Sequence, residues 1–397
     1  MTRTRITAAA AAISVTLLLG ACSVNATDPS ATAAGAGGTP VANVVTPDAG
    51  GLSRYVSPVA LPASTDTRGP DGEKPVWYTQ LNLTSAEVQR VKAGNYRAAI
   101  VWQEASPFMN ALGKGVEQTY KALGIKIVST TAANFDQTTL ANNVRSVLAL
   151  KPDVIITIAI DPVADVATFK PAVDKGVKLV FASVKPQNYK AGKEYVSLVT
   201  YDLSGLGNAT ADAVGNGLGG KGKIGQIYYD ANFYVTNQRE KAFEQTLKSK
   251  YPGIEVVDRA PMADPAKVED VAAAMIARHP DIKAIFAPWD TAAEGVVAAL
   301  RNAGRTDVGV YTIDLGNTNA LEMAKGGMIK EMTSTLAVEF GNSLAVAGAY
   351  GLLGKKAPPM VIVPAFPVTK DNLAKGWEST FGVSLPTDIA AAGGAGR

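Results

Sequence analysis

The chain is poor in the two residue types that supply most nitrogen and sulfur ligands to metals in proteins. Its 397 residues include one cysteine, Cys22, and one histidine, His279. A single cysteine excludes a disulfide within the chain, and these two residues cannot form a zinc cluster. His279 precedes Pro280 at the predicted end of a helix, where we expect it to bond the last carbonyls or water rather than to act in a catalytic triad. The sequence therefore predicts no metal, no cofactor and no catalytic residue.

The apolar run at the start of the chain is too short to cross a membrane. It follows Arg3 and Arg5 and ends in the letters LLLGAC at residues 17–22. A basic start, a short apolar run and small residues before a cut site are typical of an export signal. The cysteine directly after Leu-Gly-Ala resembles the acylated cysteine of bacterial lipoproteins. This resemblance implies that residues 1–21 are removed and that Cys22 carries lipid; an ordinary signal with an incidental cysteine is the alternative.

The chain also has little net charge. The formal net charge of +3 falls to +1 once Arg3 and Arg5 leave with the signal. A near-neutral body without a basic stripe argues against nucleic acid as a partner. We expect an exported protein held by lipid at the outer face of the cytoplasmic membrane, or in the periplasm, which touches the membrane only through that anchor.

Two stretches at the ends show no helical or strand period. Residues 22–75 are rich in Ala, Gly, Thr, Pro and Ser, and they bury too little apolar area to offset their ordering entropy. We therefore expect a flexible spacer between the lipid and the folded body. Residues 387–397 are similar in composition and are expected to form a tail.

The rest of the chain alternates short β-branched strands with amphipathic helices. The predicted strands are 98–102, 125–130, 154–158, 178–182, 224–229, 254–260, 284–287 and 308–313. The predicted helices are 110–123, 137–150, 163–175, 206–218, 238–250, 266–278 and 292–303. Nearly continuous apolar strands that alternate with helices indicate a parallel sheet covered on both faces, and the pattern restarts after residues 196–202. With 47% apolar residues the chain can bury two such cores, so the sequence predicts an α/β protein of two lobes.

One glycine-rich segment, Gly-Leu-Gly-Gly-Lys-Gly-Lys at residues 217–223, fits the opening of a phosphate-binding loop. Ile224 stands where that loop needs a hydroxyl residue. The segment also ends a predicted helix and opens a predicted strand, which is the reverse of the order that a phosphate loop requires. We interpret it as a turn.

Three short motifs stand at or beside predicted strands. They are Ser-Pro-Phe at 106–108, His-Pro-Asp-Ile-Lys-Ala-Ile-Phe-Ala at 279–287 and Val-Gly-Val-Tyr-Thr-Ile-Asp at 308–314. Their order and spacing resemble the ribose-type periplasmic binding proteins, which serve ABC importers of sugars and sugar alcohols. The first is similar to that family's Asn-Pro-Phe, and the third to its V-x-V-x-G-F-D, with Thr-Ile in place of Gly-Phe. The resemblance covers residues 96–382.

The resemblance implies two Rossmann-like lobes with parallel sheets, joined by a three-strand hinge, that bind a ligand between them. The implied amino-terminal lobe comprises residues 76–200 and 337–363, and the carboxyl-terminal lobe comprises 201–336 and 364–386. The crossings between the lobes are expected near residues 200–202, 335–337 and 363–366. We expect such a protein to work as a monomer.

Ligands of open parallel sheets bind beyond the carboxyl ends of the strands, and four prominent side chains follow predicted strands. Trp102 and Trp289 supply rings that suit stacking on a sugar or polyol, unless either packs in a loop. Asp290 and Asp314 supply ionised acceptors for hydroxyl donors, and both match acidic positions of the family motif. Asp290 has an alternative role as the cap of the helix that begins near Ala292.

The strand ends and the resemblance add further candidates for ligand binding. These are Gln103, Glu104, Phe108, Ser183, Phe233, Asn237, Arg239 and Thr335. Asn237 aligns with the family's binding arginine and Arg239 lies two residues later; a place on an ordinary surface helix is the alternative for Arg239. Ser183 and Val184 stand where ribose binders carry aspartate and arginine. This departure disfavours ribose and favours another sugar or a linear polyol.

The sequence therefore predicts a substrate-binding lipoprotein that binds a monosaccharide or sugar alcohol and delivers it to an ABC permease in the membrane. A receptor subunit of the same fold that passes a sugar-like signal to a sensor kinase is one alternative. A cell-envelope glycosidase that uses Glu104 and Asp314 as its carboxylate pair is another, although nothing in the sequence fixes their separation or raises a pKa.

Overall fold

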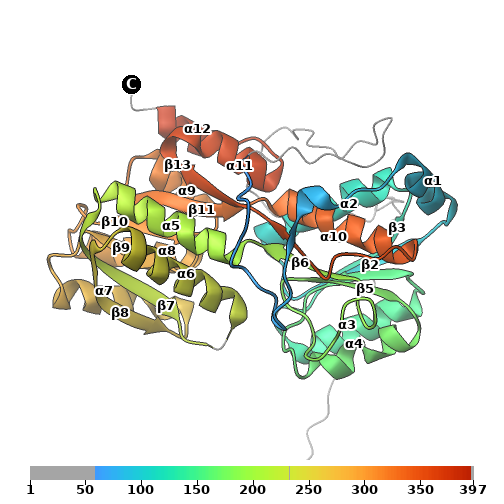
Figure 1. Ribbon diagram of the computed structural model, residues 1–397. Coiled ribbons are helices and arrows are strands. Elements are labelled where there is room, and N and C mark those ends of the chain that lie inside the picture. Colours follow the sequence, from blue (N-terminus) through green and yellow to red (C-terminus); the bar gives the residue numbers. More distant parts are fainter. Residues whose placement is uncertain (1–58, 232, 395–397) are drawn as a thin grey trace, which may run out of the picture. The chain divides into compact units, whose positions relative to one another are not determined.

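Figure 1 shows the computed structural model, which describes residues 59–231 and 233–394. Cys22 and the predicted signal lie outside the described residues. The described residues form two β-sheets that are covered by helices, so the predicted α/β class with parallel sheets and two lobes is confirmed. Each sheet with the helices that pack on it is called a lobe below, lobe one being the amino-terminal one.

Lobe one is built on a sheet in which the paired strands run parallel. In order across the sheet the strands are β1 (Val76–Trp77), β12 (Met360–Val363), β6 (Ser197–Tyr201), β5 (Lys178–Ala182), β4 (Val154–Thr157), β2 (Arg97–Trp102) and β3 (Lys126–Ala132). The helices are α1 (Ser85–Ala93), α2 (Pro107–Ala122), α3 (Gln137–Ala149), α4 (Asp165–Asp174) and α10 (Ala337–Leu352), with the 3₁₀ helix η1 (Tyr78–Gln80).

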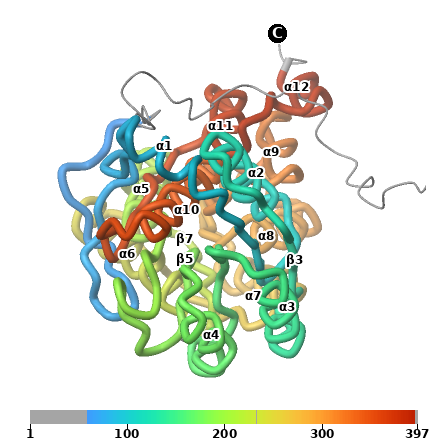
Figure 2. The backbone as a smooth tube through the Cα atoms, turned by 90° about the vertical axis from the view of Figure 1, so that its right-hand side faces the viewer, coloured from blue at the N-terminus to red at the C-terminus, as the bar shows by residue number. Residues whose placement is uncertain are grey.

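The side chains of β2 show why both faces of this sheet need a cover. Ile100 and Trp102 pack in the core with α2 and α10, whereas Val101 packs in the core with α3 and α4, because successive strand residues point to opposite faces. The helices α2 and α10 lie side by side on their face (Figure 2). The continuous apolar strands seen in the sequence are thus explained by burial on two sides.

Lobe two repeats this architecture. In order across its sheet the strands are β13 (Ala365–Thr369), β11 (Ile329–Thr335), β10 (Gly309–Ile313), β9 (Ala284–Ala287), β7 (Lys221–Tyr229) and β8 (Gly253–Met262). The remaining helices are α5 (Leu203–Gly217), α6 (Tyr234–Lys250), η2 (Pro265–Lys267), α7 (Val268–Arg278), α8 (Asp290–Asn302), α9 (Asn317–Ala324), η3 (Lys370–Asn372), α11 (Leu373–Phe381) and α12 (Thr387–Gly394). β13 runs antiparallel to β11, and the other pairs are parallel.

The chain passes between the two sheets at the three expected places. The first crossing leads from β6 into α5, the second from β11 into α10 and the third from β12 into β13. The glycine-rich segment 217–223 joins α5 to β7, as expected of a turn. The carboxyl ends of β2, β9 and β10 lead to the residues that the sequence selected for binding.

Both ends of the described chain are more ordered than composition predicts. Residues 59–75 belong to the predicted spacer, but Thr67 is completely buried and its hydroxyl donates a hydrogen bond to Asp202. Residues 387–394 belong to the predicted tail, but they form α12, which packs on α9 and buries Ile389. The spacer and tail predictions are therefore wrong for these residues. Composition does not show that a few side chains find partners elsewhere in the fold.

Candidate functional site

Two carboxylates follow neighbouring strands of lobe two. Asp290 begins α8 after β9, and Asp314 directly follows β10, which pairs with β9. Burial and the nearby charge of Asp314 raise the pKa of Asp290 to about 6. Burial also raises the pKa of Asp314, against the opposing effect of the Arg239 charge. The two carboxylates are therefore close enough to interact, and both can accept hydrogen bonds from a ligand.

Arg239 supplies a cation beside this pair. It lies on α6 with only 4% of its surface exposed, and its Nη1 is 3.5 Å from Asp314 Oδ2. This distance makes an ion pair but not a well-formed hydrogen bond, and Nη1 has no hydrogen-bond partner among the residues that the structure describes. The alternative of an ordinary surface arginine is therefore wrong, and a buried donor remains available to a ligand oxygen.

A tyrosine that the sequence analysis did not select completes this cluster. Tyr201 ends β6 at the first crossing, and the centre of its ring is 6.0 Å from the guanidinium carbon of Arg239. The ring also packs edge-to-face on Phe340 of α10, with centroids 6.1 Å apart. Its place at a strand end is the signal that could have found it, because the same rule selected Asp314.

The two lobes touch at Ser183 and Tyr234. The hydroxyl of Tyr234, the first residue of α6, donates a hydrogen bond to the carbonyl oxygen of Ser183 after β5. Ser183 has a φ of 51° and Asp314 a φ of 71°, in the left-handed region that residues other than glycine seldom adopt. Backbone strain of this kind is concentrated at functional sites. The Ser183 hydroxyl lies 3.2 Å from that of Thr200, at the first crossing.

Trp289 presents a half-buried ring at the end of β9. The ring packs edge-to-face on Tyr229 with centroids 5.3 Å apart, and its Nε1 donates to Thr291 Oγ1 at 2.7 Å. These contacts hold the indole in one orientation while part of it stays uncovered. Trp289 itself occupies the N-cap position of α8, and Asp290 is the first residue of the helix. Asp290 Oδ1 nevertheless accepts a hydrogen bond from the backbone N–H of Thr291 at 2.8 Å, so its carboxylate satisfies an amide of the first helical turn, as a cap would.

Trp102 does not provide the broad platform that the sequence analysis expected. Its indole is only 5% exposed, and it belongs to the core between β2 and α2, next to Gly113. Trp102 is thus a core residue at the margin of the site, and its contact with a ligand stays a prediction.

The other candidates of lobe one follow β2. Gln103 is 9% exposed, and its Oε1 has no hydrogen-bond partner within the described part of the chain. Burial raises the pKa of Glu104, which accepts a hydrogen bond from the Ser106 hydroxyl at 3.3 Å. Ser106 is the N-cap of α2. Phe108 lies in the first turn of that helix and is half-buried.

The remaining candidates lie on elements of lobe two. Phe233 precedes α6, with its ring 6.4 Å from that of Tyr234, and Asn237 is half-buried near the start of α6. Thr335 is buried at the end of β11, and its hydroxyl finds no partner among the described side chains and backbone. Gln103, Arg239 and Thr335 thus each keep a buried polar atom that has no partner within residues 59–231 and 233–394. Ligand hydroxyl groups would satisfy such atoms.

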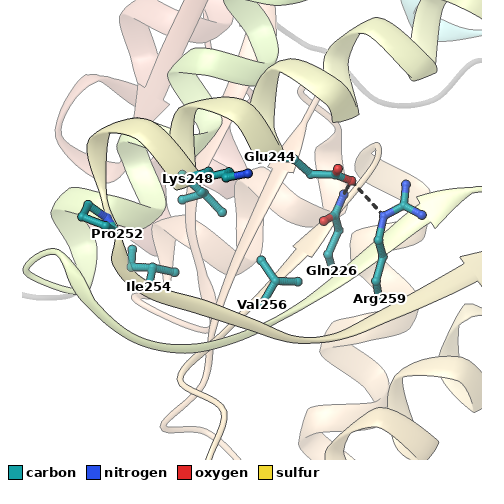
Figure 3. Close-up of a pocket in the computed structure, with 8 residues that line it drawn as sticks. Gln226, Glu244, Lys248, Pro252, Ile254, Val256 and Arg259 are labelled. Atoms are coloured by element: carbon teal, nitrogen blue, oxygen red, sulfur yellow. Dashed lines mark hydrogen bonds and ion pairs between the residues drawn. The ribbon is translucent and has the colours of Figure 1, made fainter.

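A surface pocket of about 450 Å³ opens elsewhere on lobe two, beside α6, β7 and β8 (Figure 3). Glu244 lies in this pocket and accepts hydrogen bonds from Gln226 at 2.9 Å and from Arg259 at 2.8 Å. Leu247 and Ile254 line its apolar part. The residues predicted to bind the ligand do not line this pocket, so it is distinct from the candidate site.

No group of three or more histidine, cysteine, aspartate and glutamate side chains within residues 59–231 and 233–394 is placed to hold a metal ion. None of the helices in the same ranges combines the length and the hydrophobicity that crossing a membrane requires. The two carboxylates of lobe two have a guanidinium beside them, which suits a polar organic ligand better than a metal ion.

Comparison with known proteins identifies relatives over most of the chain. Residues 97–356 match the family described as "Periplasmic binding protein domain". The chain is 26% identical over 313 residues to the ABC transporter periplasmic-binding protein YphF of Escherichia coli, and the match covers 77% of this chain and 95% of that protein. It is 28% identical over 293 residues to a xylitol-binding protein of Mycolicibacterium smegmatis, covering 70% of this chain and 78% of that protein.

Solved structures share the fold. A solute-binding protein of an ABC transporter from Agrobacterium vitis, bound to α-D-tagatopyranose, superposes with a TM-score of 0.64 at 23% identity and covers 73% of this chain and 99% of its own. A solute-binding protein from Mycobacterium smegmatis with bound glycerol gives a TM-score of 0.63 at 23% identity and covers 74% and 100%. Both agree with the two-lobed architecture described above.

Proposed function

The chain belongs to the periplasmic binding protein family, and on this premise we propose that it is the substrate-binding lipoprotein of an ABC importer. It holds a monosaccharide or a sugar alcohol between its lobes and delivers it to the permease. The family is one of binding proteins, so the chain is not an enzyme, and the glycosidase hypothesis is set aside. Membership of this family also places the protein outside the cytoplasm.

The observation that carries the proposal is the cluster beyond the ends of β9 and β10. Arg239 lies 3.5 Å from Asp314, Asp314 raises the pKa of Asp290, and the ring of Trp289 follows the same strand as Asp290. Carboxylates accept hydrogen bonds from hydroxyl groups, a guanidinium donates to hydroxyl oxygens, and an indole covers a C–H face. A ligand that is dense in hydroxyl groups matches all three.

The relatives support the same chemical class. One of them is named for binding xylitol, and one of the superposed structures holds a sugar, α-D-tagatopyranose. Ser183 and Val184 lack the charges that ribose binders carry at these positions. These features favour a sugar alcohol or a sugar other than ribose. The kinship with a protein of an ABC transporter favours import over the signalling alternative.

The mechanism is differential binding by two lobes. Asp290, Asp314 and Arg239 contact the ligand from lobe two, and Gln103 and Ser183 contact it from lobe one only when the lobes are together. Changing the ratio of closed to open molecules from 1:99 to 99:1 takes about 5.5 kcal/mol of differential binding free energy. Several net hydrogen bonds of about 1 kcal/mol each, with a ring contact of about 1 kcal/mol, supply that amount. The closed monomer then presents both lobes to the permease.

A thermal-shift panel of monosaccharides and sugar alcohols tests the proposal. A ligand at a hundredfold excess over its Kd stabilises the folded chain by about 2.7 kcal/mol, which raises the Tm of a body of this size by about 4 °C. We expect at least one member of the panel to do this at millimolar concentration. Amino acids and short peptides serve as controls. A panel in which no sugar or sugar alcohol moves the Tm would contradict the proposal.

The lipid anchor is tested at Cys22, which lies outside the described residues. We expect Cys22→Ser to move the exported protein from the membrane fraction to the soluble fraction, because acyl chains contribute about 0.8 kcal/mol for each buried CH₂ and the variant has none. Ser23→Ala is the matched control, because it changes the next residue and keeps the thiol. Membrane retention of Cys22→Ser, measured by fractionation and immunoblot, would show that the anchor is not at this cysteine.

A further inference from the structure

A segment that precedes the matched family region crosses between the lobes. Residues 65–73, called the strap here, lie ahead of residues 97–356 and within the predicted spacer. They belong to the blue segment before α1 in Figure 1. Thr67 is completely buried. The contacts of the strap fall into three groups, one on each lobe and one at the first crossing.

On lobe one the strap contacts a buried lysine through two carboxylates. Lys185 is 3% exposed, and its Nζ lies 3.0 Å from Asp71 Oδ2 and 3.8 Å from Glu73 Oε1. Lys190 also approaches Asp71, at 2.9 Å. A buried cation that loses its partners is strongly destabilising, so this end of the strap is firmly attached. Lys185 lies two residues after Ser183, so the strap holds the loop that carries a candidate binding residue.

At the first crossing the strap holds Asp202, the N-cap of α5. The hydroxyls of Thr65 and Thr67 donate to Asp202 Oδ1 at 2.5 and 2.6 Å. The Thr67 hydroxyl oxygen in turn accepts a hydrogen bond from the backbone N–H of Ser204 at 2.9 Å. Asp202 also accepts from the N–H of Gly205, which is its capping bond. The strap therefore fixes the start of α5, the first helix of lobe two.

On lobe two the strap pairs with a glutamine of α6. Gln238 Nε2 donates to the carbonyl oxygen of Arg68 at 2.8 Å, and Gln238 Oε1 accepts from the N–H of Arg68 at 3.0 Å. The Arg68 guanidinium turns back and donates to the carbonyls of Thr65 and Thr67, which stiffens this part of the strap. Gln238 directly precedes Arg239. The strap is therefore attached to the turn of α6 that carries the buried arginine of the candidate site.

We propose that the strap is a connection between the lobes additional to the three crossings and that it opposes their separation. The proposal rests on the proposed function in one respect, since a binding protein of this kind must separate its lobes to admit a ligand. Separation has to break one attachment of the strap. The Arg68–Gln238 pair breaks first, because it joins two neutral groups, whereas Lys185 is buried and charged.

Gln238→Ala tests the strap without a ligand. Alanine favours the helix, so α6 is kept while both hydrogen bonds to Arg68 are lost. Spin labels at Ser146→Cys in α3 and Ser249→Cys in α6, both exposed, report the distance between the lobes in a Cys22→Ser background. We expect Gln238→Ala to raise the population with separated lobes about tenfold, as the loss of two neutral hydrogen bonds implies.

Gln245→Ala is the matched control, because it makes the same change at an exposed position of the same helix. It should keep the distance distribution of the parent. Gln238→Glu keeps the acceptor for the Arg68 N–H but loses the donor to the Arg68 carbonyl. Its population with separated lobes should therefore lie between those of Gln238→Ala and the parent. Equal distributions for Gln238→Ala, Gln245→Ala and the parent, with circular dichroism showing all three folded, would overturn the proposal. No sugar is added, so that result would leave the sugar-binding function untouched.

Discussion

Asp314→Asn lowers the affinity of the chain for its sugar ligand about a hundredfold, because hydrogen bonds to a charged group are worth about 1.5–3 kcal/mol more than none. The substitution removes the charge and one acceptor while it keeps the shape of the side chain. Asparagine also tolerates the φ of 71° at this position, so the backbone after β10 stays in place. Arg239, which is 4% exposed, then loses the carboxylate 3.5 Å away. The variant therefore loses the charged contact of residue 314 with the ligand, and Arg239 loses the carboxylate that orients it.

Isothermal titration calorimetry with the best ligand of the panel measures this effect. Asp307→Asn is the matched control, since Asp307 precedes the same strand at its other end, is 51% exposed and pairs with Arg305 at 2.7 Å. It should leave the Kd of the parent unchanged. If Asp314→Asn binds as tightly as Asp307→Asn, then Asp314 does not contact the ligand, and the site must lie elsewhere.

Trp289→Ala lowers the affinity about thirtyfold, through the loss of the apolar area and of about 0.5–1.5 kcal/mol of ring contact. The ring is half-buried against Tyr229, with centroids 5.3 Å apart, so it is already held in the orientation that a ligand meets. A rigid ring adds contact area at little cost in conformational entropy, and alanine supplies neither the area nor the face.

Trp289→Phe separates stacking from other effects of the substitution. Phenylalanine keeps an aromatic face but loses the Nε1 bond to Thr291 and part of the ring area, so we expect its Kd to lie closer to that of the parent than to that of the alanine variant. Both variants are compared with the parent by calorimetry after their Tm values are recorded. Equal losses for alanine and phenylalanine would show that the ring does not stack on the ligand, and the platform would have to be sought elsewhere.

The sequence predicted the two-lobed α/β fold because its signals are local and repeated. Strands such as Val154–Thr157 and Ala284–Ala287 are buried along their whole length and almost entirely apolar, because both faces of each sheet are covered. The starts of α2 and α5 were predicted three residues late, because Ser106 and Asp202 act as caps further upstream than the first periodic residue. Because ligands of parallel sheets bind beyond the carboxyl ends of the strands, the sequence also pointed to Asp290 and Asp314. These two residues lie close together because β9 and β10 are neighbours in the sheet.

The sequence could not predict features that depend on distant partners. Thr67 belongs to a stretch of spacer-like composition, and only the fold brings Asp202 within hydrogen-bond reach of it. Trp102 ends a strand, but the packing of α2 on that face decides that its ring is core. Arg239 sits in a run of polar residues that is typical of a surface helix, and its burial beside Asp314 depends on how α6 meets β10.

A crystal structure of the chain with the best ligand of the panel is the most direct test of the central claim, that strand ends of two lobes hold one small hydroxylated molecule. We expect the ligand hydroxyls to contact the carboxylates of Asp290 and Asp314 and the guanidinium of Arg239. We also expect a C–H face of the ligand to lie on Trp289, and Ser183 to contact the ligand from lobe one. A ligand found instead in the pocket beside Glu244, or bound to one lobe alone, would contradict it.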